Sequence, residues 1–119
     1  MYKEVQIGDT TFPMLSMAST DVFYRQIFHK DANKIQTAED FGGSEALEFI
    51  FELAFIMNKR AEGKTRQEMA QLTEDDYMDW LDNVDRGGLY DASGEIWAVY
   101  NGQRETTSDA KKNGDSLTA

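Results

Sequence analysis

Apolar residues crowd into one stretch of this chain, over residues 46–57. Ten of these twelve positions carry an apolar side chain: Ala46, Leu47, Phe49, Ile50, Phe51, Leu53, Ala54, Phe55, Ile56 and Met57. Polar side chains recur there at helical spacings of three, four and seven, at Glu45, Glu48, Glu52 and Lys59. The pattern predicts a long helix over residues 44–62, capped by Ser44, that is apolar on nearly every side.

Such a helix has to bury apolar side chains on more than one side. The run is shorter than the about 20 apolar residues that cross a bilayer, so we expect it to be buried in protein. Leu47, Phe51 and Phe55 form one ridge, whereas Phe49 and Ile56 lie on other arcs. A chain of 119 residues has little core to spare. We therefore expect part of this helix to meet a partner or a second copy, with wrapping by two layers of short helices as the alternative.

The first residues alternate between apolar and polar side chains, which is the pattern of a strand. Tyr2, Val5 and Ile7 precede the turn pair Gly8-Asp9, and a second β-prone run continues up to Pro13. We expect a small hairpin whose second strand is confined to an edge by the proline.

Shorter amphipathic segments fill the rest of the first hundred residues. We expect a helix after Ser19, Thr20 or Asp21, a short segment at 35–41, and helices over 65–72 and from Thr73 to the stop Gly87-Gly88. A last helix is expected over 93–100, with a strand as the alternative because of its β-branched and aromatic residues. Their inward residues are expected to be Val22, Phe23, Tyr24, Ile27, Phe28, Met69, Leu72, Tyr77, Trp80, Leu81, Val84, Ile96, Trp97 and Tyr100. The fold class is thus mainly α: a small helical domain over 1–102 with a short N-terminal β-hairpin, followed by a disordered, polar C-terminal tail over 103–119.

The net charge of the chain restricts the classes of molecule that it can bind. Lys and Arg number 12 against 22 Asp and Glu, which gives a net charge of −10. Such a field repels phosphate backbones and anionic lipid, so we expect no nucleic-acid or membrane partner, whereas basic proteins are attracted. There is no cysteine, hence no disulfide and no thiolate metal site. No secretory signal precedes the hairpin, and we expect a cytoplasmic protein.

Candidate chemistry is sparse. His29 is the single histidine, and we interpret it as a surface or half-buried residue rather than a ligand or base. The acidic run around Asp82 fails as a calcium loop, because Val84 and Arg86 fall on ligand positions and Ser93 replaces the closing glutamate. Gly42-Gly43-Ser44 lacks the lysine of a phosphate loop. No carboxylate pair stands out as catalytic. We expect no enzyme activity, no catalytic residue, no metal and no cofactor.

Two short motifs carry a resemblance to a known family. The first places Tyr24, Arg25, Phe28 and Asp31 on one helix, and the second places Leu53, Ala54, Phe55 and Met57 on the long apolar helix. Together with the opening strand pair and a later Asp79-Trp80-Leu81, this resembles the tail assembly chaperones of long-tailed bacteriophages infecting Gram-positive hosts. The family often has glycine where this chain has His29.

The resemblance implies a protein that binds the long helical tape-measure protein, keeps it soluble and helps recruit tail-tube subunits. It implies a location in the host cytoplasm and absence from the mature virion. Many members also occur in a longer form made by a ribosomal frameshift. Lys111-Lys112-Asn113 could come from an adenine-rich slippery run, although two solvated lysines are an equally good interpretation.

We expect the apolar contacts with such partners to come from Leu47, Phe51, Phe55 and Met57, with Trp80 as a lesser candidate. Glu48 and Glu52, together with Glu45, would edge the contact and favour basic partner segments. The alternative function is a small acidic regulator or inhibitor that occupies a basic cleft of a partner protein.

Overall fold

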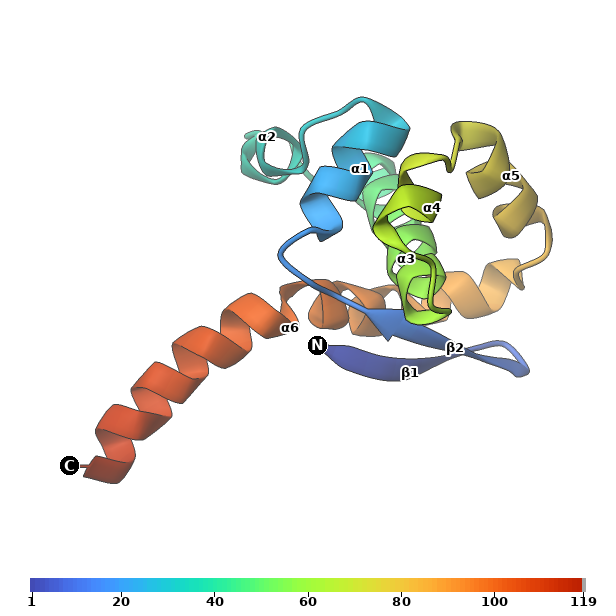
Figure 1. The fold of residues 1–119 in the computed structure, drawn as a ribbon. Coiled ribbons are helices and arrows are strands. Elements are labelled where there is room, and N and C mark those ends of the chain that lie inside the picture. The colour runs from blue at the N-terminus through green and yellow to red at the C-terminus, as the bar shows by residue number, and fades with distance from the viewer. Residues whose placement is uncertain (119) are drawn as a thin grey trace.

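In the computed structural model, residues 1–118 form an N-terminal hairpin and six helices, with side chains described for residues 1–102 (Figure 1). The elements, in chain order, are β1 (Tyr2–Ile7), β2 (Thr10–Leu15), α1 (Thr20–Phe28), α2 (Ala32–Thr37), α3 (Gly43–Ala61), α4 (Arg66–Ala70), α5 (Glu74–Asp82) and α6 (Arg86–Thr118). The predicted fold class, mainly helical with a short hairpin, is confirmed. The disorder predicted over 103–119, and the suggestion about Lys111-Lys112-Asn113, lie outside the residues whose side chains are described and stay predictions.

The hairpin pairs β1 with β2 in antiparallel register, with Val5 opposite Phe12 and Glu4 opposite Pro13. Its turn is at Gly8, whose φ of 63° is readily adopted by glycine. β2 continues through Pro13 to Leu15, two residues beyond the predicted β-prone run. The N-terminal ammonium of Met1 donates to the carbonyl of Ser16, and the amide of Ser16 donates to the carbonyl of Met1; such bonded pairs alternate with non-bonded pairs along the ladder. Pro13 lies three residues before Ser16 and therefore falls in a non-bonded pair with Glu4. Its missing N–H breaks no hydrogen bond between the strands.

The long apolar helix α3 lies at the centre of the fold. It ends two residues before Gly63, whose φ of 97° favours glycine, and its last turn carries Lys59 and Arg60, as predicted. The expected cap, Ser44, lies in the first turn instead, because the helix begins one residue earlier with Gly42 at the cap position. The helix therefore matches the sequence prediction to within a residue at each end.

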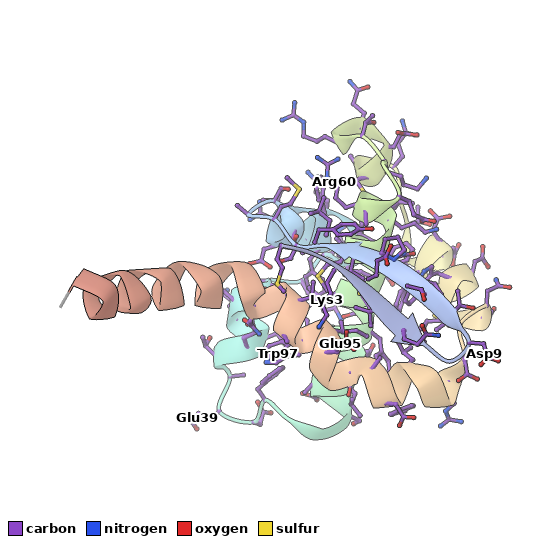
Figure 2. All side chains as sticks on the ribbon, turned by 90° about the horizontal axis from the view of Figure 1, so that it is seen from below. Lys3, Asp9, Glu39, Arg60, Glu95 and Trp97 are labelled. Carbon is purple, nitrogen blue, oxygen red and sulfur yellow. The ribbon has the colours of Figure 1, made fainter. Side chains whose placement is uncertain are left out.

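Other elements cover α3 on several sides. β2 and α6 pack on it from the lower layer of Figure 1, while α1 and α5 pack on it from above. The hairpin lies beside α6, where Lys3 and Glu95 form an ion pair of 3.1 Å between the two (Figure 2). The fully buried side chains come from nearly every element and include Val5, Met14, Tyr24, Phe49, Leu53, Phe55, Ile56, Met57, Met69 and Ile96. One contiguous core thus surrounds the C-terminal two thirds of α3.

The short helices begin at side-chain caps that the sequence supplies. Thr65 and Thr73 form capping boxes with Glu68 and Asp76, each pair satisfying two backbone amides. Asp31 accepts from the amides at 33 and 34, so α2 begins at Ala32, three residues before the predicted position.

Five of the predicted inward residues are less buried than expected, and three of them, Leu81, Val84 and Trp97, are half-buried at the margin of the core. Val22 lies on the exposed side of α1. Leu72 is half-buried between α4 and α5.

The glycine pair at 87 and 88 begins a helix rather than ending one, which corrects the sequence prediction. α5 ends at Asp82, and the carboxylate of Asp85 accepts from the amide of Gly88 at 2.7 Å, starting α6. A Cβ on Gly88 would lie 2.2 Å from the backbone nitrogen of Gly8. Glycine at 88 therefore lets the first turn of α6 approach the hairpin turn closely.

We expect Gly88→Ala to lower the free energy of unfolding by about 1–3 kcal/mol, because the added methyl group meets backbone rather than a flexible side chain. Gly94→Ala is the matched control on the same helix, with no atom within 4 Å of the new methyl. It should raise stability by about 0.4–1 kcal/mol. Urea denaturation of both variants measures the difference, and equal effects would contradict this account of the contact between α6 and the hairpin.

A candidate partner-binding surface on α3 and α6

Three of the predicted partner contacts lie in the core instead. Phe55 and Met57 have no exposed surface, and Trp80 is 8% exposed. Phe55 packs edge-on against Tyr77 and Trp80, at ring-centroid distances of 5.6 and 5.8 Å. The prediction that Phe55, Met57 and Trp80 contact a partner is wrong for the folded chain, because α5 and β2 cover this part of α3.

Trp80 is held inward by a polar bridge through the centre of the molecule. Its indole Nε1 donates to the side-chain oxygen of Asn58 at 3.0 Å, and the amide nitrogen of Asn58 donates to the carbonyl of Pro13 at 3.0 Å. Asn58 is buried, so each of these bonds replaces one that water would otherwise make. The bridge ties α5, α3 and β2 together.

Glu52 was predicted to lie at the margin of the partner contact, but it is buried, with only 4% of its surface exposed. The hydroxyl of Tyr24 donates to its Oε1 at 2.7 Å, and the ammonium of Lys30 lies 3.2 Å from its Oε2. Burial raises the pKa of the Glu52 carboxyl above its ordinary value, while the bonds from Tyr24 and Lys30 act in the opposite direction. Burial and the neighbouring carboxylate likewise raise the pKa of Tyr24.

The predicted residues that remain accessible lie near the N-terminal end of α3. Leu47 and Phe51 are half-buried, and Glu48 is exposed. Ile50, three residues after Leu47, is also half-buried, and Tyr90 on α6 is 43% exposed and packs edge-on against Phe51 at 5.2 Å. We call Leu47, Ile50, Phe51 and Tyr90 the α3–α6 patch. Ile50 could have been found from the apolar run, whereas nothing in the sequence brings Tyr90 to this helix.

Charged side chains flank the α3–α6 patch. The exposed carboxylates of Glu48 and Asp91 are chain neighbours of Leu47 and Tyr90. One cation is present as well, since the guanidinium of Arg86 lies 5.8 Å from the centre of the Tyr90 ring. A half-exposed apolar surface with carboxylates beside it suits an apolar helix face that carries basic residues along its edge.

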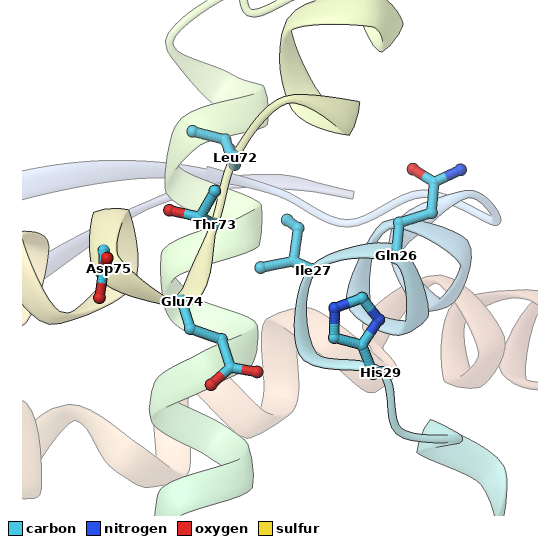
Figure 3. Close-up of a pocket in the computed structure, with 7 residues that line it drawn as sticks. All are labelled: Gln26, Ile27, His29, Leu72, Thr73, Glu74 and Asp75. Carbon is cyan, nitrogen blue, oxygen red and sulfur yellow. The ribbon is translucent and has the colours of Figure 1, made fainter.

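The single histidine lies at a different hollow of the surface. His29 and Gln26 of the α1 end face Thr73, Glu74 and Asp75 at the start of α5 across a pocket of about 290 Å³ (Figure 3). His29 adopts a left-handed conformation with φ of 58° and closes α1 as its C-cap. His29 is therefore an exposed residue that ends a helix.

The part of the chain with described side chains contains no group of three or more histidine, aspartate or glutamate residues placed to hold a metal ion. Asp85, in the acidic run that was considered for calcium, caps α6 instead. No helix in the described residues is long and apolar enough to cross a membrane.

Comparison with known proteins does not identify the chain. No family model, no curated protein and no solved structure matches it. Its function is therefore inferred from its own surface and motifs.

We expect Phe55→Ala to lower the free energy of unfolding by about 3–5 kcal/mol, since it empties a fully buried site. Phe51→Ala removes the same atoms from a half-exposed site on the same helix and should cost only about 1 kcal/mol. Chemical denaturation monitored by circular dichroism compares the two. Similar losses would mean that Phe51 belongs to the core and is no contact surface.

The raised pKa of Glu52 predicts a pH dependence of stability. The folded state holds the Glu52 proton more tightly than the unfolded chain does, so this carboxyl favours folding below its ordinary pKa of 4.5. That contribution is lost as the pH rises through the folded-state value. The stability of the native protein relative to Glu52→Gln should therefore fall between pH 4.5 and neutrality. Urea titrations at several pH values measure it, and a constant difference would contradict the burial of this carboxylate.

Proposed function

We propose that this chain is a tail assembly chaperone of a long-tailed bacteriophage, which binds helical segments of the tape-measure protein and helps recruit tail-tube subunits. The observation that carries the proposal is the α3–α6 patch on a strongly acidic protein. A half-exposed apolar surface can shield the apolar face of an unassembled helix from water. The net charge of −10 keeps the resulting complex soluble.

The positions of the motif residues support the family resemblance. Tyr24 and Phe28 of the first motif are buried on α1, and Leu53 and Phe55 of the second lie in the core of α3. Tyr24 packs on Phe28 at 5.2 Å and reaches α3 through Glu52. These residues therefore specify how α1 and α3 pack, and proteins that share them are expected to share this packing.

Two further motif positions have local structural roles. Asp31 caps α2. His29 adopts the left-handed conformation that glycine favours, at the position where the family often has glycine. A glycine at this site would close α1 in the same way, and the left-handed conformation of His29 supports the resemblance at this position.

The proposed contact resembles the docking of an amphipathic helix in a shallow apolar groove. Ile50 and Phe51 follow Leu47 by three and four residues, so the three side chains share one face of α3. Tyr90 extends this surface onto α6. A partner helix lying across both elements would place apolar residues on the patch and basic residues near Glu48 and Asp91.

The proposal expects a very long helical protein to be encoded near this gene, and the test is binding to immobilised fragments of that protein. Phe51→Asp should weaken binding by about 2 kcal/mol, roughly 30-fold, because a carboxylate would then be buried under the partner. Val22→Asp is the matched control, since Val22 is 43% exposed on α1. It should bind normally.

Circular dichroism shows whether Phe51→Asp is folded. A folded Phe51→Asp protein that binds as tightly as the native chain would reject the surface. The absence of genes for a tail-tube protein and a very long helical protein near this gene would reject the tail-assembly role.

A further inference from the structure

The outer edge of β1 is an unpaired sheet edge. β1 pairs with β2 alone, and bonded pairs alternate with non-bonded pairs from Met1 and Ser16 onward. The peptide groups of Tyr2, Glu4 and Gln6 therefore point away from β2. Within the part of the chain whose side chains are described, no hydrogen bond joins the backbone of these three residues to another element. All three residues are exposed, so their N–H and C=O groups are available to a further strand.

The corresponding edge of β2 is closed. Pro13 has no N–H to donate, and its carbonyl already accepts from the side-chain nitrogen of Asn58 on α3 at 3.0 Å. β2 also packs closely on α3. The two edges of the hairpin thus differ, and the sheet can be extended at β1.

A hollow of about 450 Å³ lies between the edge of β1 and α6. Gln6 lines it on the hairpin side, and the carboxylates of Asp85, Asp91 and Glu95 line it on the other. Asp85 caps α6, and Glu95 forms an ion pair with Lys3 (Figure 2), whereas Asp91 is exposed and forms no ion pair with any described residue. Since β1 packs on α6, one face of a strand added beside β1 would lie toward this acidic hollow.

The opposite face of β1 carries an exposed aromatic ring. Val5 and Ile7 are buried on the face that packs on the helices, so Tyr2 lies on the outer face, where 56% of its surface is exposed. Leu15, which is opposite Tyr2 on β2, is half-buried. An apolar side chain on an added strand would cover this ring as a cross-strand neighbour.

We propose that β1 accepts an extended segment of a partner protein as a third strand, with basic side chains toward α6 and apolar side chains beside Tyr2. Main-chain hydrogen bonds to the edge supply affinity, and the alternating side chains supply selectivity. A basic segment complements both the hollow and the net charge of −10. The site uses no residue of the α3–α6 patch and does not rest on the proposed function.

A second copy of this chain fits the edge less well. An antiparallel pair of β1 strands, in the register that pairs all three edge residues, would place the two Glu4 carboxylates directly opposite each other. The two copies would also each carry a net charge of −10. The charges of the edge therefore favour a basic partner over self-association.

The test uses a short peptide of alternating lysine and valine, added to the full chain and followed by amide hydrogen exchange. The amides of Tyr2, Glu4 and Gln6 should become protected, while those of Lys3 and Val5, already bonded to β2, should change little. N-methylation of one alternate set of peptide residues should abolish binding, the valines for an antiparallel strand and the lysines for a parallel one. Methylation of the other set should leave binding intact. Equal effects of the two methylated peptides, or no binding of the parent peptide, would overturn the proposal.

The acidic face is tested by a matched pair of variants. Asp91→Asn should weaken binding of the lysine peptide several-fold, whereas Asp79→Asn, the same change at an exposed position on α5, should alter it little. Equal effects would mean a response to net charge alone and would overturn the proposed basic face. A peptide with glutamate in place of lysine should not bind, and binding as tight as that of the lysine peptide would contradict the proposal in the same way.

Two further measurements separate the alternatives. Phe51→Asp should bind the lysine peptide as the native chain does, since Phe51 lies on the α3–α6 patch. Loss of peptide binding by the folded variant would place the peptide on that patch and reject the sheet edge, leaving the proposed function standing. Sedimentation equilibrium should show a monomer, and a dimer with protected amides at Tyr2, Glu4 and Gln6 would assign the edge to a second copy and reject a basic partner segment.

Discussion

The helix α3 is apolar around most of its circumference, and this one property constrains the rest of the fold. A helix of this kind is stable in water only when other elements cover it on several sides. β2, α6, α1 and α5 do so for its C-terminal two thirds, where Leu53 to Met57 are all buried. The N-terminal end is covered less completely, and Leu47, Ile50 and Phe51 stay half-exposed there. The accessible apolar surface is thus what remains after a small domain has covered as much of the helix as its length allows.

Two buried polar side chains on α3 determine how its neighbours are arranged. Asn58 bonds to Trp80 of α5 and to Pro13 of β2, and Glu52 bonds to Tyr24 of α1 and to Lys30. A buried polar group without a partner destabilises a fold by about 1–3 kcal/mol, so each of these bonds favours one arrangement over its alternatives. The two residues are six positions apart and act on different sides of the helix. Apolar packing drives the elements together, and these bonds select the register in which they meet.

The same arrangement places two kinds of surface next to each other on α3. The α3–α6 patch is apolar, and the pocket between α1, α2 and α3 is lined by the acidic residues Glu45, Glu48 and Glu52 together with Lys30. Neither surface is formed by α3 alone. Tyr90 comes from α6, Tyr24 comes from α1, and Lys30 comes from the loop that follows α1. A partner with an apolar helix face and a basic edge would contact both surfaces at once, as the proposed function requires.

The sequence by itself determined the elements whose signals are local: the Gly8-Asp9 hairpin, the threonine caps of α4 and α5, and the limits of α3 to within a residue. Local signals failed at Gly88, because a glycine that ends many helices is needed here for contact with a turn 80 residues away. Of the seven predicted contact residues, Leu47, Glu48 and Phe51 are accessible, while Phe55, Met57, Trp80 and Glu52 are buried. Helical periodicity shows that a side chain is apolar and which arc it occupies, but not which arc other elements will cover. Only tertiary packing decided that, since it depends on where α5, α6 and the hairpin come to rest on the same helix.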